Sequence, residues 1–247
     1  MNEGSIAVIA DIHGNTWALD AVLKDIQRRK IENVVNLGDS IYGSLDPAGT
    51  LDRLMRSSII SISGNQDRIV FERDEQILAS QDHRFVTSQM SEAQLRWLGS
   101  LPPTHTIDDV LFCHGTPWSD ETYLLETVTE HGVFLSDTAT ILAHLRAVEH
   151  AVVLCGHSHV PRIVWLSDGR LIVNPGSVGI PAYTHDLPFP HVMEAGSPHA
   201  RYAVLSRQPE GCAVEQIAVP YAWDEAAAVA RRNGREDRAR WIESGRA

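Results

Sequence analysis

The stretch Ser5-Ile6-Ala7-Val8-Ile9-Ala10-Asp11-Ile12-His13-Gly14-Asn15 decides how the rest of the chain is interpreted. Its apolar beginning predicts a buried strand, and the strand ends in two side chains that can bind metal. In an extended chain, residues two apart point the same way, so Asp11 and His13 could aim a carboxylate oxygen and an imidazole nitrogen at one point. Asn15 is a good N-cap for the amphipathic stretch 16–30, so we expect a strand, a ligand loop and a helix. Taken alone, the pair is also compatible with a turn cap and a surface histidine.

Four more apolar segments are expected to be strands, and each ends in a short polar motif. They are residues 33–37, 58–62, 110–113 and 151–155. In open α/β sheets, ligands gather outside the carboxyl ends of the strands, so the polar groups should converge. Together with the first segment, these motifs carry seven candidate metal ligands: Asp11, His13, Asp39, Asn65, His114, His157 and His159. Seven nitrogen and oxygen ligands suit two metal ions better than one.

The ligand types indicate the metal and the chemistry. Carboxylate and amide oxygens mixed with imidazoles, without a thiolate, favour two divalent transition metal ions such as Mn, Fe, Zn, Ni or Co. A carboxylate has two oxygens and can bridge two cations. Two ions roughly 3.5–4 Å apart lower the pKa of a bridging water to form hydroxide and hold the oxygens of an in-line displacement at phosphorus. The pattern therefore predicts phosphoester hydrolysis.

Five motifs in the same order resemble those of the calcineurin-like metallophosphoesterase superfamily. They are Asp11-x-His13, Gly38-Asp39, Gly64-Asn65-x-Asp67, His114-Gly115 and Gly156-His157-x-His159. The resemblance extends from residue 5 to about residue 206, and more narrowly it is to the small bacterial and archaeal phosphodiesterase-like branch. It implies an α/β fold, a four-layer α/β/β/α sandwich in which two mixed β-sheets face each other and the site lies at their common edge.

The resemblance also implies which residue binds which ion. One metal would be held by Asp11, His13, Asp39 and His159, and the second by Asp39, Asn65, His114 and His157. Asp39 would then bridge the two ions, for which manganese is the first expectation. The catalytic residues implied are Asp39, Asn65, Gln66 and Asp67.

Gln66 departs from the family pattern. Many relatives have a histidine there, which is assigned to protonating the leaving group or stabilising the transition state. Glutamine can donate a hydrogen bond but cannot transfer a proton near neutral pH. We therefore expect a preference for substrates with good leaving groups. Asp67, which orients that histidine in the family, is expected to be structural or to contact the metal ligands.

A second departure concerns the cation that grips phosphate. Family members often have an arginine shortly after the Gly-Ser-Val-Gly turn, where this chain has Pro181-Ala182-Tyr183. Arg68 or Arg162 is a candidate replacement. Three histidines of the following segment could replace the missing acid, line the mouth of the site or simply be exposed: His185, His191 and His199.

Composition restricts the class of partner. The formal net charge of -11 repels polyanions, so long DNA or RNA is not expected, whereas a small phosphoester or nucleotide is compatible with bound cations. The length of 247 residues fits a single domain, 1–247. No apolar run approaches the roughly 20 residues that span a membrane, so we expect the protein in the cytoplasm. The sequence does not decide whether the protein forms a homo-oligomer. The arginines of the segment 231–240 are interpreted as a solvated face of one C-terminal helix.

The remaining segments carry weaker expectations. Residues 68–103 are expected to be helical, with a capping box at Ser91 and Gln94. Residues 121–149 are expected to be mostly helical, with Ser136 as a cap, and residues 180–199 to form a long loop. Antiparallel strands are expected at 162–166, 171–173, 201–206 and 213–219, with Asp168-Gly169 as a hairpin turn. Cys113 and Cys155 are expected to be buried as small apolar side chains.

Two functions of different class fit these observations. The first is a binuclear metal-dependent phosphoesterase, either a phosphodiesterase or a nucleotide pyrophosphohydrolase. The second is a non-catalytic metal-binding scaffold of the same fold. Only Gln66 favours the scaffold, because the chain keeps every ligand that the family pattern requires.

Overall fold

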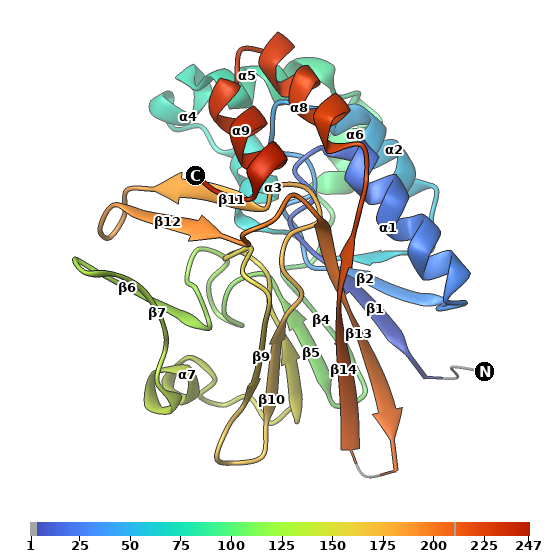
Figure 1. Cartoon of the computed structure of the whole chain (residues 1–247), viewed down its shortest axis with the longest axis vertical. Helices are drawn as coiled ribbons and strands as arrows, with labels where there is room; N and C mark the ends of the chain where they lie inside the picture. Colours follow the sequence, from blue (N-terminus) through green and yellow to red (C-terminus); the bar gives the residue numbers. More distant parts are fainter. Residues whose placement is uncertain (1–3, 210) are drawn as a thin grey trace.

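The computed structural model describes residues 4–209 and 211–247, and in these two ranges the chain builds two five-stranded sheets (Figure 1). In the first sheet, β1 pairs in parallel with β2 and antiparallel with β13, with Ile6 opposite Asn33 and Leu205, so the sheet is mixed. Its strands, in spatial order, are β14 (Gly211–Val219), β13 (Ala200–Gln208), β1 (Ile6–Ile9), β2 (Asn33–Asn36) and β3 (Ile60–Ser61).

The second sheet is also mixed. Strands β5, β8 and β10 run parallel to one another. At the two edges of the sheet, β4 pairs antiparallel with β5 and β9 pairs antiparallel with β10. The strands, in spatial order, are β4 (Thr104–Ile107), β5 (Val110–Cys113), β8 (Val152–Leu154), β10 (Leu171–Asn174) and β9 (Arg162–Trp165). The predicted antiparallel strands and the turn at Asp168-Gly169 are confirmed.

The core lies between the two sheets and continues on their outer faces. Inward-facing side chains such as Val8 and Val35 of the first sheet and Phe112 and Leu154 of the second form one buried cluster. The opposite face of the first sheet packs on α1 (Thr16–Arg28) and α2 (Pro47–Met55), and that of the second on α7 (Thr138–His144). The layers are therefore α/β/β/α, which confirms the expected fold.

Most of the helical predictions are confirmed, and the thiols behave as expected. Residues 65–98 form α3 (Asn65–Arg68), a 3-10 turn (Ile69–Phe71), α4 (Glu75–Ala79), α5 (Gln81–Gln89) and α6 (Glu92–Leu98). The capping box forms at the start of α6, where the Ser91 hydroxyl accepts from the Gln94 amide and the Gln94 side chain accepts from the Ser91 amide. Cys113 and Cys155 are buried between the second sheet and α7.

The prediction of helix for residues 121–149 was wrong in its first half. A hairpin of β6 (Glu126–Thr129) and β7 (Gly132–Leu135) stands there, and only α7 is helical. Thr127, Val128 and Thr129 are β-branched and prefer strands, and the turn uses Gly132 at a φ of +121°. The N-cap of α7 is Asp137, whose side chain accepts from the Thr140 amide, and not Ser136.

The segment 180–199 is not a loop, because β11 (Ala182–His185) and β12 (His191–Glu194) pair as a hairpin. Alternation of buried and exposed residues in β12 shows why: Met193 is buried while Val192 is exposed. The hairpin lies below α9 (Glu236–Ser244) in Figure 1, and the segment after it is joined to the C-terminus, since the Gly196 amide donates to the Gly245 carbonyl.

The C-terminal arginines are divided between two helices, α8 (Trp223–Arg232) and α9 (Glu236–Ser244), and the N-cap of α9 at Arg235, and do not lie on one helix. The interpretation of them as a solvated face was wrong for Arg238, which is only 8% exposed. The two helices pack through small residues such as Ala226 and Ala230, and this contact turns one side of α9 toward the body of the protein. In the described ranges, the helices are all too short or too polar to cross a membrane.

Candidate metal centre

The loops that follow β1, β2, β5 and β8, together with the start of α3, bring the predicted ligands to one edge shared by the two sheets. Backbone contacts fix these loops against one another: the Asp11 amide donates to the Gly38 carbonyl (3.0 Å) and the His13 amide to the Asp39 carbonyl (3.0 Å). The strand ends therefore converge as expected, although they come from two sheets.

Five of the seven candidate ligands have left-handed backbones. The φ angles are 56° at Asp11, 51° at His13, 52° at Asp39, 69° at His157 and 61° at His159. This conformation is uncommon for residues with a side chain, and it gathers where a site constrains the chain. The expectation of an extended Asp11-Ile12-His13 was thus wrong in its geometry. The backbone is left-handed at both Asp11 and His13, and in this conformation the two side chains come together.

Asp11, His13 and His159 form the first cluster, in which one ligand atom of each lies within 4.8 Å of the others. The Nδ1 atoms of His13 and His159 contact the carbonyls of Tyr42 (2.9 Å) and Ile180 (2.6 Å). A carbonyl can only accept, so both Nδ1 atoms carry hydrogen and, in neutral rings, both Nε2 atoms carry lone pairs. These lone pairs face each other at 3.1 Å, and a cation beside them would remove the conflict.

Asp39, His114 and His157 form the second cluster. The Nδ1 of His114 donates to the Leu37 carbonyl (2.8 Å), and its Nε2 faces the Asp39 carboxylate at 3.5 Å. The Nε2 of His157 contacts the Glu121 carbonyl (3.0 Å), which leaves its Nδ1 free to bind metal. Backbone carbonyls that fix the tautomer of each ring are typical of metal-binding histidines.

Electrostatics distinguishes the imidazoles. Burial and the neighbouring His159 lower the pKa of His13 to about 4, and burial with the neighbouring His114 lowers the pKa of His157 to about 4. Burial also disfavours the charged form of His114, but the charge of Asp39 prevails and raises its pKa to about 10. His114 therefore differs from His13 and His157, because the neighbouring Asp39 carboxylate favours its charged form.

The donor set fits two divalent ions. Asp11 Oδ1 is buried and has no hydrogen-bond partner among the residues described; its close neighbour, the Nε2 lone pair of His159, is 3.4 Å away. An unpartnered buried carboxylate oxygen is costly unless a cation binds it. Hard oxygens, borderline imidazoles and the absence of thiols from both clusters suit manganese, iron, zinc, nickel or cobalt.

The start of α3 positions Asn65, Gln66 and Asp67 against Asp39. The Gln66 amide donates to Asp39 Oδ1 (2.9 Å), and Asn65 Oδ1 lies 3.0 Å from the Nε2 of His114. Gly64 is required for this approach, since a Cβ there would lie 2.2 Å from Asp39 Oδ1.

Asp67 lies behind these residues. Its carboxylate accepts from the amides of Ser40 (2.9 Å) and Gly64 (3.1 Å), and so ties the loop after β2 to the loop after β3. It is fully buried and does not line the pocket described below.

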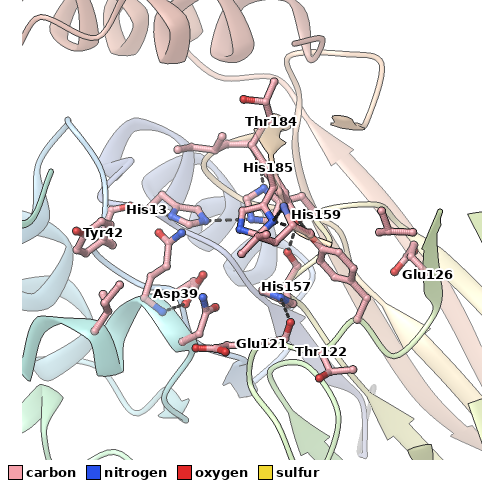
Figure 2. A pocket seen from close by; sticks show the side chains of 18 of the residues that line it. His13, Asp39, Tyr42, Glu121, Thr122, Glu126, His157, His159, Thr184 and His185 are labelled. Atoms are coloured by element: carbon pink, nitrogen blue, oxygen red, sulfur yellow. Dashed lines mark hydrogen bonds between the residues drawn. The ribbon is translucent and has the colours of Figure 1, made fainter. Parts of the chain in front are cut away.

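A pocket of about 1160 Å³ lies in front of both clusters. Figure 2 shows His13 and Asp39 facing it from the loops after β1 and β2, and His157 and His159 from the loop after β8, with the contact between His13 and His159 dashed. Gln66 also lines the pocket, and its side-chain Oε1 is buried without a hydrogen-bond partner in the described ranges. A small organic molecule could therefore reach the predicted ligands from the solvent.

The two arginines that the sequence offered as phosphate-binding cations lie outside the pocket. Arg68 forms ion pairs with Asp120 (2.8 Å) and Glu121 (2.8 Å), Arg162 pairs with Glu126 (2.8 Å), and neither arginine lines the pocket.

Of the three candidate histidines, only His185 lines the pocket. The Nε2 of His191 lies 3.2 Å from the hydroxyl of Tyr123, a residue that does line the pocket. His199 lies beside Trp223.

Sequence reasoning missed a second group of pocket residues. Tyr123 and Tyr183 join their hydroxyls at 2.7 Å, and Tyr183 donates to the His157 carbonyl (3.1 Å). Arg238 and Trp241 reach the pocket from α9. None of these belongs to a strand-end motif. The one signal in the sequence was the Pro-Ala-Tyr that replaces the family's arginine.

Residues 5–192 match the family model of the calcineurin-like phosphoesterase superfamily domain, and the chain belongs to this family. An uncharacterised protein of Methanocaldococcus jannaschii is 27% identical over 207 residues, which are 73% of this chain and 79% of that protein. A metallophosphoesterase from Sphaerobacter thermophilus shares the fold with a TM-score of 0.76 and 24% identity, over 98% of this chain and 99% of that one. A hypothetical protein from Pyrococcus horikoshii does so with a TM-score of 0.74 and 18% identity, over 98% of each chain.

Proposed function

We propose that this protein is a binuclear metal-dependent phosphodiesterase of the cytoplasm, acting on small phosphorylated molecules as one domain. The observation that carries the proposal is the pair of ligand clusters beside an open pocket. In the first cluster the Nε2 atoms of His13 and His159 face each other at 3.1 Å, and Asp11 Oδ1 has no hydrogen-bond partner among the described residues. Family membership makes a phosphoesterase the expected class of enzyme.

In this proposal, Asp11, His13 and His159 hold one ion, and Asn65, His114 and His157 hold the other. Asp39 would be shared between the two ions. Two such ions, when bound, supply a water of lowered pKa and positive charge for the phosphoryl oxygens. Manganese is the first choice, and iron, zinc, nickel or cobalt would satisfy the same donors.

The chain's own residues then orient the reacting groups. The Gln66 amide holds Asp39 Oδ1, and Asp67 fixes the loops that carry Asp39 and Asn65. The Gln66 side chain lines the pocket and can donate a hydrogen bond to a phosphoryl oxygen, but it has no proton to give to a leaving group. The favoured substrates are therefore phosphodiesters of acidic alcohols and phosphoanhydrides, because their leaving groups depart without being protonated.

The pocket supports a substrate of nucleotide size. Its volume of about 1160 Å³ exceeds the roughly 300–1,000 Å³ that is usual for small-molecule sites. The net charge of -11 argues against a long nucleic acid, whose binding depends on many cationic contacts.

Hydrolysis of bis(p-nitrophenyl) phosphate tests the proposal. Chelator-treated protein should be inactive and should regain turnover when MnCl₂ is added, whereas Asp39→Asn should stay inactive. His131→Asn is the control, because this histidine is exposed in the turn between β6 and β7 and does not line the pocket. Chelator-treated protein that takes up metal yet hydrolyses neither this ester nor any nucleotide of a panel would instead support the non-catalytic scaffold.

A further inference from the structure

Arg238 lies on the wall of the pocket, although it comes from α9, at the far end of the chain from the ligand motifs. Its side chain is 10% exposed, and its Nη2 donates to Asp82 Oδ2 at 2.6 Å. The Nε and Nη1 atoms are buried and have no hydrogen-bond partner among the described residues. A buried guanidinium with two idle nitrogens is costly unless an acceptor meets it.

The position of Arg238 is tied to the first ligand cluster. The Nη1 atom lies 3.1 Å from the point where a Cβ of Gly43 would stand, and that same point is 2.3 Å from the His13 carbonyl oxygen. The neighbouring Tyr42 carbonyl accepts from the Nδ1 of His13. Glycine at 43 thus lets the guanidinium approach the loop that carries His13, and both Arg238 and His13 line the pocket.

Arg238 has no carboxylate to itself among the described residues, because its ion-pair partner is shared with another arginine. Arg235 contacts both Asp82 and Asp237, so Asp237 is already engaged by another cation. Among the described residues Arg238 forms an ion pair only with Asp82, a carboxylate that also pairs with Arg235. Two arginines and two aspartates make this group neutral, and an anion that reached the Nε and Nη1 of Arg238 would meet donors without an opposing carboxylate.

We propose that Arg238 binds a second phosphoryl group of the substrate, next to the one held at the metal clusters. This inference rests on the proposed function and narrows its substrates to organic molecules with at least two linked phosphates, as in nucleoside polyphosphates and dinucleoside polyphosphates. An arginine suits this task because its planar donors match the oxygens of a phosphate. Trp241, one helical turn further along α9, also lines the pocket and offers an aromatic surface to the organic part.

The variant Arg238→Lys tests the proposal, because it keeps the charge and loses the two idle guanidinium nitrogens. Its KM should be compared for diadenosine tetraphosphate and for bis(p-nitrophenyl) phosphate, which has a single phosphate. The first KM should rise at least about tenfold more than the second, which corresponds to about 1.4 kcal/mol of lost binding free energy, because the hydrogen bonds of the guanidinium to the second phosphate are lost. Arg240→Lys, on the exposed side of the same helix, should change neither value.

A second variant covers the case in which Arg238→Lys does not fold. Asp82→Asn removes the one carboxylate that Arg238 contacts, and it should lower the KM for diadenosine tetraphosphate several-fold relative to the simple diester. Equal changes for the two substrates in both variants would overturn the inference and leave the proposed function intact. A wild-type protein that hydrolyses neither substrate with any metal would overturn both.

Discussion

The Nε2 atoms of His13 and His159 face each other at 3.1 Å, while each Nδ1 donates to a backbone carbonyl of a different loop. The carbonyls fix both Nδ1 atoms as donors, so each ring, when neutral, turns an Nε2 lone pair toward the other. Such a contact is unfavourable by itself and becomes favourable when a cation accepts both lone pairs. The folded protein is therefore prepared for metal before metal arrives.

Metal should stabilise the fold for this reason. A ligand at 100 times its Kd contributes about 2.7 kcal/mol, which is roughly 5–10 °C in Tm for a chain of this size. Differential scanning fluorimetry of chelator-treated protein, with and without MnCl₂, measures the shift. An unchanged Tm at saturating metal would show that the clusters do not bind it in the folded state.

Asp11 and Asp39 should differ in their effect on metal content. Asp11 belongs only to the first cluster, so Asp11→Ala should reduce binding at one position while the fold persists. Asp39 lies 3.5 Å from the Nε2 of His114 and, in our proposal, bridges the ions, so Asp39→Ala should weaken both positions. Metal analysis after gel filtration measures the ions per chain, and His131→Asn should match wild type. Two ions per chain in Asp11→Ala would refute the assignment.

Gln66→His should restore help to the leaving group. Gln66 lines the pocket beside Asp39 and has no transferable proton near neutral pH, whereas a histidine there could protonate the leaving oxygen. We expect about 10²-fold faster turnover of an alkyl phosphoester, within the range for general-acid catalysis, and little change for p-nitrophenyl esters. If turnover of the alkyl ester is unchanged, this explanation of substrate preference must be abandoned.

The thiols offer a test of the fold away from the site. Burial raises the pKa of Cys113 to about 12 and that of Cys155 well above its usual range, whereas Cys212 is partly exposed. Because only the thiolate reacts, iodoacetamide at pH 8 should label Cys212 alone in the native protein and all three cysteines after unfolding. Mass spectrometry of the peptides reads the sites, and rapid native labelling of Cys113 would contradict the packing of the second sheet on α7.

The sequence predicted the parts of this protein that depend on local pattern. The strands were recognisable as apolar runs, and the ligands stood directly after them, so convergence followed from the rule that strand ends share an edge. What it could not provide was backbone geometry: Asp11 and His13 meet through left-handed residues and not through an extended chain. Nothing in the residue types of that loop distinguishes the two conformations.

The parts that were missed depend on contacts between distant segments. Strands β6 and β11 and helix α9 contribute residues to the wall of the pocket, although these three elements lie far apart in the chain. Arg238 stands among charged residues and had every local sign of a solvated side chain. Its burial follows from how α9 is placed by α8 and by the segment around Gly43, which no local pattern encodes.

A metal titration of activity tests the central claim most directly. Chelator-treated protein would receive Mn²⁺ in steps up to four equivalents, with bound metal and hydrolysis of bis(p-nitrophenyl) phosphate measured on the same samples. We expect both to rise together and to level off at two ions per chain, with no turnover in Asp39→Asn at any step. Turnover that is complete without added metal, or that saturates at a single ion, would contradict the binuclear phosphodiesterase proposed here.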